Sequence, residues 1–167
     1  MKTKLLRTVL LLSVVCIMNS CSSDTSDADA LDTNLSVVEN YDYTATELEA
    51  MNLINDYRVS VGLNRLEKIN HMSYKSEEHD NYMIANKVVN HNDFVARSQN
   101  IIKVLGAITV AENIAYNYNS PKDALKAWLN SPGHKENILG NFTHFGIAIK
   151  ADPENGRKYY TNIFAKI

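Results

Sequence analysis

The sequence has almost no cysteine: of its 167 residues only Cys16 and Cys21 carry a thiol, and none follows residue 21. The body of the chain therefore has no disulfide framework, no thiolate zinc site and no catalytic cysteine. It also has no excess of charge, because residues 44–167 hold fourteen Lys or Arg against thirteen Asp or Glu. No basic patch indicates nucleic-acid binding. Histidine, carboxylate and hydroxyl groups remain as the available chemistry.

No apolar run is long enough to cross a bilayer as a mature helix, which needs about 20 residues. The longest, Val9–Met18, follows a basic start and predicts a cleaved export signal over residues 1–20. Cys21 follows at a position that resembles a bacterial lipobox, in which the thiol carries diacylglycerol. We therefore expect lipidation of Cys21, although Met18 and Asn19 depart from the commonest pattern. The alternative is an ordinary secretory signal.

Residues 21–43 contain six acids, no base and few large apolar side chains. This composition predicts a flexible, solvated tether. A lipid on Cys21 followed by this tether predicts a protein anchored in the bacterial envelope, at the outer membrane or the cell surface. The remaining 124 residues, 44–167, are enough for one domain with its own core.

Helix signals dominate the first half of this domain. A capping box at Thr44 and Glu47 opens the first helix, and apolar spacing predicts two more. The predicted helices run from Thr44 to Gly62, from about His71 to Lys87 and from Phe94 to Leu105. The segment from Asn90 to Asp93 is typical of a loop.

Strand signals appear in the second half. Residues 108–118 predict a strand, and Ser120-Pro121 and Ser131-Pro132 each predict a short helix with proline at its first position. Alternating residues in 145–149 and 159–167 predict two closing strands around a turn. Helices beside a small, mostly antiparallel sheet indicate an α+β sandwich.

Two of the five histidines stand out because they lie at loop or helix-start positions, where functional groups collect. They are His91, in the predicted loop, and His134, at the start of the last predicted helix. His71 is expected to be exposed or to cap a helix, and His79 and His144 are expected to be structural. Forty-three residues separate His91 from His134, so their spacing alone gives no metal signature.

Four segments of the domain resemble, in sequence and in order, the motifs of one known family. These segments are Leu53–Arg58, Asn90–Phe94, Ala111–Ala115 and Trp128–Leu139. They resemble the CAP superfamily of cysteine-rich secretory, antigen 5 and pathogenesis-related 1 proteins, also called SCP-like domains. The resemblance extends over about 50–164 and is greatest to bacterial members without disulfides. It implies an α-β-α sandwich with a central cleft that holds two histidines and two acids.

By this resemblance, His91 and His134 match the two histidines and Glu112 matches one acid. The second acid of eukaryotic members would stand at Ser131, so the set is incomplete, and Asp93 is a candidate replacement. His91 and His134 could hold Zn²⁺ weakly as neutral imidazoles, at about 2.0–2.1 Å. Glu112 could then orient one imidazole or a bound water. Alternatively, Glu112 accepts hydrogen bonds from both histidines and braces the sheet against the helices.

Two functions follow as expectations. The first is a surface-tethered binding module whose cleft takes a lipid, glycan or protein ligand. The second is a metal-dependent hydrolase, a protease or cell-wall enzyme, that uses His91, Glu112 and His134. A structural envelope domain is a third, and whether the protein is an enzyme stays open. A nucleophilic Ser131 is disfavoured, because Ser-Pro serves as a helix cap and no Gly-x-Ser-x-Gly elbow is present. Trp128 is expected in the core.

Overall fold

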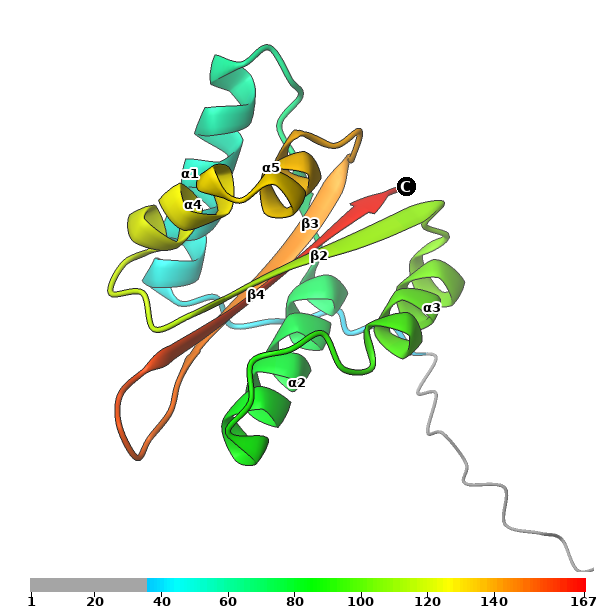
Figure 1. Ribbon diagram of the computed structural model, residues 1–167. Helices are drawn as coiled ribbons and strands as arrows, with labels where there is room; N and C mark the ends of the chain where they lie inside the picture. Colours follow the sequence, from blue (N-terminus) through cyan, green and yellow to red (C-terminus); the bar gives the residue numbers. More distant parts are fainter. Residues whose placement is uncertain (1–35) are drawn as a thin grey trace, which may run out of the picture. The chain divides into compact units, whose positions relative to one another are not determined.

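A computed structural model describes residues 36–167, which belong to one unit (Figure 1). The predicted export signal and Cys21 lie outside the described residues. Within the described part of the chain, no helix has both the length and the apolar character needed to cross a membrane.

The elements follow the predicted order. The helices are α1 (Ala45–Ser60), α2 (Asn70–Asn86), α3 (Phe94–Leu105), α4 (Pro121–Asn130) and α5 (Pro132–Leu139). The strands are β1 (Glu67–Lys68), β2 (Thr109–Tyr116), β3 (His144–Ala151) and β4 (Lys158–Lys166). Only β1 was not predicted, because a strand of two residues shows no alternation in the sequence.

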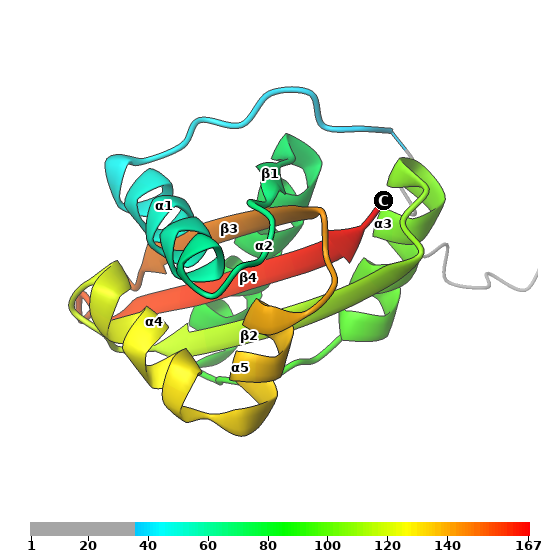
Figure 2. The ribbon, with the colours of Figure 1, turned by 90° about the horizontal axis from the view of Figure 1, so that it is seen from above.

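The strands form one sheet in the order β1-β3-β4-β2. β1 is parallel to β3, and the other neighbours are antiparallel. α1, α4 and α5 cover one face of this sheet, and α2 and α3 cover the other (Figures 1 and 2). The α-β-α sandwich implied by the resemblance is therefore confirmed.

The larger core lies between the sheet and the helices α1, α4 and α5. Ile54, Trp128, Ile138, Phe145 and Phe164 are among its buried side chains. Two smaller apolar clusters fill the other side, under α2 and α3. Burial of these side chains is the main force that holds the helices on the sheet.

The predicted capping box also connects α1 to the sheet. The Thr44 hydroxyl accepts from the Glu47 N–H, and the Glu47 carboxylate accepts from the Thr44 N–H at 2.8 Å. The same carboxylate accepts from the Tyr41 hydroxyl and the Ile149 N–H, both at 3.0 Å. Glu47 is only 1% exposed, so these donors compensate the loss of its hydration.

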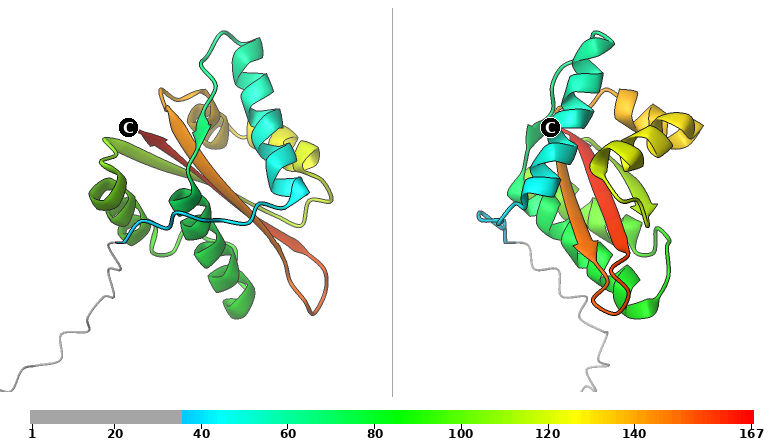
Figure 3. Two further views of the ribbon diagram at one scale, coloured as in Figure 1. Left: turned by 180° about the vertical axis from the view of Figure 1, so that it is seen from behind. Right: turned by 90° about the vertical axis from the view of Figure 1, so that its left-hand side faces the viewer.

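Residues 36–43 lie along the domain and cross α2 near its start (Figure 3). The Val38 N–H donates to His71 Nδ1 at 3.2 Å, and the Asn70 amide donates to the Glu39 carbonyl at 2.6 Å. His71 Nε2 lies 2.7 Å from Asn100 Oδ1. The expectation of an exposed or capping His71 is therefore wrong: the ring is 1% exposed, because a segment distant in sequence covers it.

Candidate functional site

β2 is an edge strand of the sheet, and a cavity of about 400 Å³ lies beside it. His91, from the loop between α2 and α3, and His134, from the first turn of α5, both border this cavity. Ser131 adds a polar hydroxyl group to the cavity wall, and Tyr118 and Trp128 add aromatic rings to it. Two histidines separated by 43 residues thus meet at one cavity, as the resemblance implied.

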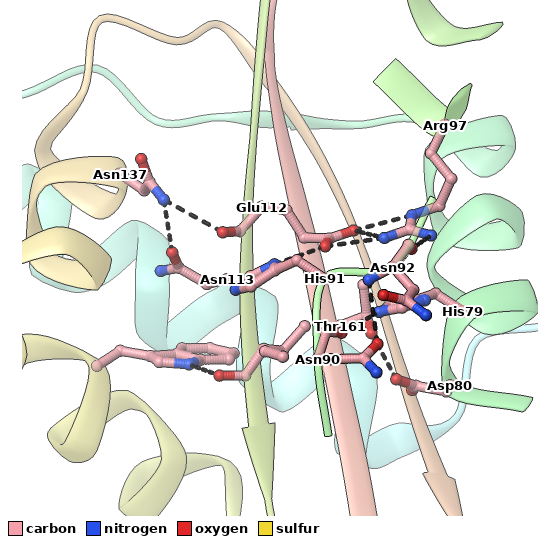
Figure 4. Close-up of polar contacts among 12 residues, drawn as sticks. His79, Asp80, Asn90, His91, Asn92, Arg97, Glu112, Asn113, Asn137 and Thr161 are labelled. Carbon is pink, nitrogen blue, oxygen red and sulfur yellow. Dashed lines mark hydrogen bonds and ion pairs between the residues drawn. The ribbon is translucent and has the colours of Figure 1, made fainter. Parts of the chain in front are cut away.

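Glu112 projects from β2 beneath His91 and is deeply buried, with its side chain 1% exposed. Its carboxylate accepts from His91 Nδ1 at 2.8 Å (Figure 4). Arg97 on α3 donates to the same carboxylate through Nε at 3.0 Å and Nη2 at 2.9 Å. Both carboxylate oxygens are therefore engaged, and the guanidinium compensates the buried charge.

Arg97 is the site residue that sequence reasoning missed. Its side chain is only 10% exposed, and Nη1 also donates to the Asn92 carbonyl at 2.7 Å. One weak signal of this role is present in the sequence: an arginine one turn into an amphipathic helix that directly follows the His91 loop. A pattern of this kind usually marks a solvated charge, and only the packing of α3 against β2 brings Arg97 to Glu112.

The loop that carries His91 is held by side chains of α2. His79 Nε2 donates to the Asn90 carbonyl at 2.7 Å (Figure 4). Asn92 Nδ2 donates to the Tyr82 hydroxyl at 2.6 Å. Burial, followed by the nearby charge of Arg97, lowers the pKa of His79. A neutral His79 suits this role, because the carbonyl needs only one N–H donor. His79 thus helps to hold the loop that carries His91.

His134 has a different partner. Its Nδ1 lies 2.7 Å from the Ser131 hydroxyl oxygen, and Glu112 contacts His91 but, within residues 36–167, not His134. Burial, and then the charge of His91, lowers the pKa of His134. The Ser131 side chain makes no capping bond to α5, which corrects the interpretation of that serine as a side-chain cap. Asp93 stands exposed at the start of α3 and does not border the cavity.

Amide side chains fix α5 against β2. Asn113 Nδ2 donates to the His134 carbonyl at 2.9 Å, and Asn137 Nδ2 donates to Asn113 Oδ1 at 2.8 Å. Asn137 also donates to the Glu112 carbonyl at 3.2 Å (Figure 4). The orientation of His134 relative to the strand is thereby set by a network in which each amide has a partner.

Two buried side chains support this arrangement from α1 and α4. The Trp128 indole, 2% exposed, donates to the Ile114 carbonyl at 2.8 Å, which confirms its expected place in the core. Arg58, fully buried, donates through Nη1 to the carbonyls of Ile138 at 2.6 Å and Gly140 at 2.9 Å. These carbonyls lie at the C-terminal end of α5, so Arg58 satisfies acceptors that the helix itself leaves unpaired.

The site offers two imidazoles as metal donors. His91 and His134 each use Nδ1 in a contact with the protein, which leaves Nε2 on both rings. A carboxylate behind an imidazole is the usual arrangement of a metal-bound histidine. Within residues 36–167, however, no three His, Cys, Asp or Glu side chains are grouped so that they could hold one ion. The donor set therefore does not fit a closed zinc site.

Comparison with known sequences identifies relatives for most of the domain. The profile of the cysteine-rich secretory protein (CAP) family matches residues 51–164. The uncharacterized membrane protein YlbC of Bacillus subtilis is 32% identical over 130 residues, which make up 74% of this chain and 35% of YlbC. The uncharacterized protein YkwD of the same bacterium is 52% identical over 40 residues, or 23% of this chain and 16% of YkwD. The chain thus spans about a third or less of the length of either relative.

Solved structures show the same fold. An extracellular protein of Bacillus anthracis that contains an SCP domain matches with a TM-score of 0.64 at 22% identity, over 77% of this chain and 45% of that chain. An outer surface protein of Borrelia burgdorferi matches with a TM-score of 0.63 at 18% identity, over 77% and 98%. The family profile covers most of the domain, and its matched range contains His91, Glu112 and His134. The chain belongs to the cysteine-rich secretory protein (CAP) family.

Proposed function

We propose that this protein is an envelope-anchored binding module that takes a small ligand in the cavity beside β2. One observation carries the proposal: both predicted histidines border a cavity of about 400 Å³, whereas Glu112 is withdrawn from it into an ion pair. A pocket with mostly apolar walls and a few convergent polar groups is the usual form of a ligand site.

The ion pair also explains why binding is preferred to hydrolysis. A general base must reach the proton it removes, directly or through one water. Both Glu112 oxygens are already engaged by Arg97 and His91, and the side chain is 1% exposed. Glu112 therefore acts as a positioning residue that orients the His91 ring.

A weak metal site at the two histidines is the second part of the proposal. The support is the carboxylate behind His91, which accepts from Nδ1 and leaves Nε2 as the ring nitrogen that a neutral imidazole would offer to an ion. His91 and His134 would hold the ion, and a bound Zn²⁺ would supply a Lewis acid. With two protein ligands, we expect weaker binding than at the three or four ligands of ordinary zinc sites.

The envelope location is also a proposal. It rests on Cys21 in its lipobox-like context and on the acidic segment that follows. An extracellular protein and an outer surface protein are among the structures with this fold. In cells, Cys21→Ser should move the protein from the membrane fraction to the soluble fraction, and unchanged fractionation would contradict the anchor.

The binding function is tested by nuclear magnetic resonance with a library of small fragments. We expect fragments to shift the amide signals of residues that border the cavity, such as Tyr118 and His134, and to leave those of α3 unchanged. A library that produces no shifts around the cavity would overturn the proposal.

Zinc titration by calorimetry tests the metal site separately. His91→Ala and His134→Ala should each abolish the uptake of Zn²⁺. His144→Ala is the matched control, because His144 contacts Thr143 and lies outside the cavity wall. Equal uptake by all three variants would exclude the two-histidine site.

A further inference from the structure

The cavity wall formed by β2 has an unequal supply of main-chain donors and acceptors. The Asn117 N–H donates to the Lys158 carbonyl at 2.7 Å, and Asn113 is paired with Asn162 in the same register. In an antiparallel pair of strands, every second residue forms main-chain hydrogen bonds with the partner strand. Since Asn117 does so, the N–H and C=O groups of the odd-numbered β2 residues point toward β4. The groups of Glu112, Ile114 and Tyr116 therefore point away from β4, at the open edge of the sheet.

Side chains occupy two of these three outward carbonyls, those of Glu112 and Ile114. The Asn137 amide donates to the Glu112 carbonyl (Figure 4). The Trp128 indole donates to the Ile114 carbonyl. No corresponding acceptor within residues 36–167 pairs with the outward N–H groups of Ile114 and Tyr116. Both of these residues border the cavity. At Ile114 the edge therefore presents an N–H donor while its carbonyl is occupied, whereas Tyr116 presents both its N–H and its carbonyl, so outward donors outnumber free outward acceptors along Glu112–Tyr116.

The Ser131–His134 pair adds one more donor, whichever tautomer the histidine adopts. A neutral imidazole and a hydroxyl carry two polar hydrogens between them. The 2.7 Å contact between Ser131 Oγ and His134 Nδ1 uses one of them. The other remains on His134 Nε2 or on the serine hydroxyl, and both residues border the cavity.

The rest of the wall has no acidic side chain and is largely apolar. Val89, Ala127 and the aromatic rings of Tyr118 and Trp128 lie around the polar groups. His91, held by Glu112 through Nδ1, contributes Nε2 to this rim, and Tyr116 and Tyr118 carry hydroxyl groups. A ligand that fits these walls needs an apolar body and an oxygen that accepts several hydrogen bonds.

We propose that the cavity receives the acyl group of a small organic carboxylate or carboxamide with an apolar body, whose oxygen accepts from the β2 main chain and the Ser131–His134 pair. This assignment rests on the proposed binding function and specifies its ligand class. The carboxylate uses the donors alone. The carboxamide can in addition donate its own N–H to His91 Nε2.

The test compares four molecules with the same phenylpropyl body: hydrocinnamate, hydrocinnamamide, hydrocinnamyl alcohol and hydrocinnamylamine. Affinities are measured by magnetic resonance titration of the full chain. We expect the carboxylate or the carboxamide to bind at least about tenfold more tightly than the amine. The acyl oxygen accepts hydrogen bonds from the donors of the wall, whereas the ammonium group can accept none of them. The amide protons of Ile114 and Tyr116 should move downfield, and the tighter of the two acyl compounds identifies the source of the oxygen.

Two variants locate the binding. Ala127→Trp should fill the cavity and abolish binding of the acyl compounds, whereas Lys126→Trp, on the exposed side of the same helix, should leave it unchanged. Retained binding in Ala127→Trp would overturn the assignment. So would an amine that binds as tightly as the acyl compounds, or binding that leaves the Ile114 and Tyr116 amides unmoved.

Failure of this assignment is distinguishable from failure of the binding function. If library fragments shift the cavity signals but none of the acyl compounds does, the ligand class is wrong and the binding module stands. If neither the library nor the four molecules shift them, both proposals are overturned.

Discussion

Two carboxylates, those of Glu112 and Asp80, are buried on the same side of the sheet, and they differ in their partners. Glu112 on β2 lies against Arg97, whose guanidinium binds both of its oxygens. Asp80 on α2 is fully buried, and the Thr161 hydroxyl donates to its Oδ1 at 2.6 Å. Asp80 Oδ2 has no hydrogen-bond partner within residues 36–167 (Figure 4).

This difference in partners affects whether each buried carboxyl group carries a charge. Burial raises the pKa of Asp80 well above its ordinary value of 3.8, and the hydrogen bond from Thr161 opposes this only in part. Asp80 therefore favours its protonated form in the folded protein. Glu112 instead binds the Arg97 guanidinium and the imidazole of His91, and of these His91 borders the cavity. A buried acid thus supports a site only where the fold also buries its counter-ion.

The largest expected effect comes from removing that counter-ion. Arg97→Met leaves Glu112 buried without a cation and should lower the free energy of unfolding by about 3–5 kcal/mol. Urea unfolding at neutral pH measures it. Glu112→Gln in the same chain should restore much of the loss, because no charge then remains to be compensated. Lys103→Met, on an exposed part of α3, is the matched control, and an equal effect of both methionine variants would contradict the comparison.

Asp80→Asn should alter the pH dependence of stability. Because folding raises the pKa of Asp80, the unfolded chain releases this proton first, and stability falls as the pH rises above about 3.9. The slope from this one group is at most about 1.4 kcal/mol per pH unit, until the folded protein also ionises. The variant should lose this slope in unfolding curves measured from pH 3.5 upward, roughly the start of the window.

Asp56→Asn is the control for that series, since Asp56 is exposed and paired with Arg65 at 3.0 Å. It should leave the slope almost unchanged. Parallel curves for the wild type and Asp80→Asn would show that Asp80 ionises alike in the folded and unfolded chain, and the contrast with Glu112 would disappear.

The smallest effect is expected from Thr161→Val. The substitution keeps the shape of the side chain and removes the hydroxyl that donates to Asp80, at a cost of about 1–2 kcal/mol for one buried hydrogen bond. Thermal or urea unfolding measures it. A loss as large as that of Arg97→Met would mean that the hydroxyl, and not the absence of a cation, controls Asp80.

The sequence predicted the elements well because their signals are local. Thr44 and Glu47 form the predicted capping box, and Ser120 caps α4 as Ser120-Pro121 indicated. The family motifs also indicated His91, Glu112 and His134. The motifs did not indicate how these residues pair: His91 contacts Glu112, whereas His134 contacts Ser131.

The errors arise where a distant segment changes a residue's surroundings. His71 has the pattern of an exposed helix start and is buried, because residues 36–43 and Asn100 cover it. Arg97 has the pattern of a surface charge and lies against Glu112. Neither contact is visible in a window of one helix, since the partners are 29 and 15 residues away in the chain.

By itself, the sequence determined the family, the order of helices and strands, and the absence of cysteine chemistry in the domain. These depend on short-range hydrogen bonding, apolar periodicity and composition. Only the tertiary structure decided that Glu112 has a counter-ion and that His91 and His134 have different partners. It also decided that β2 presents N–H donors to a cavity. The reason is physical: burial and charge compensation depend on everything packed within a few ångströms, and the chain brings those groups together from separate elements.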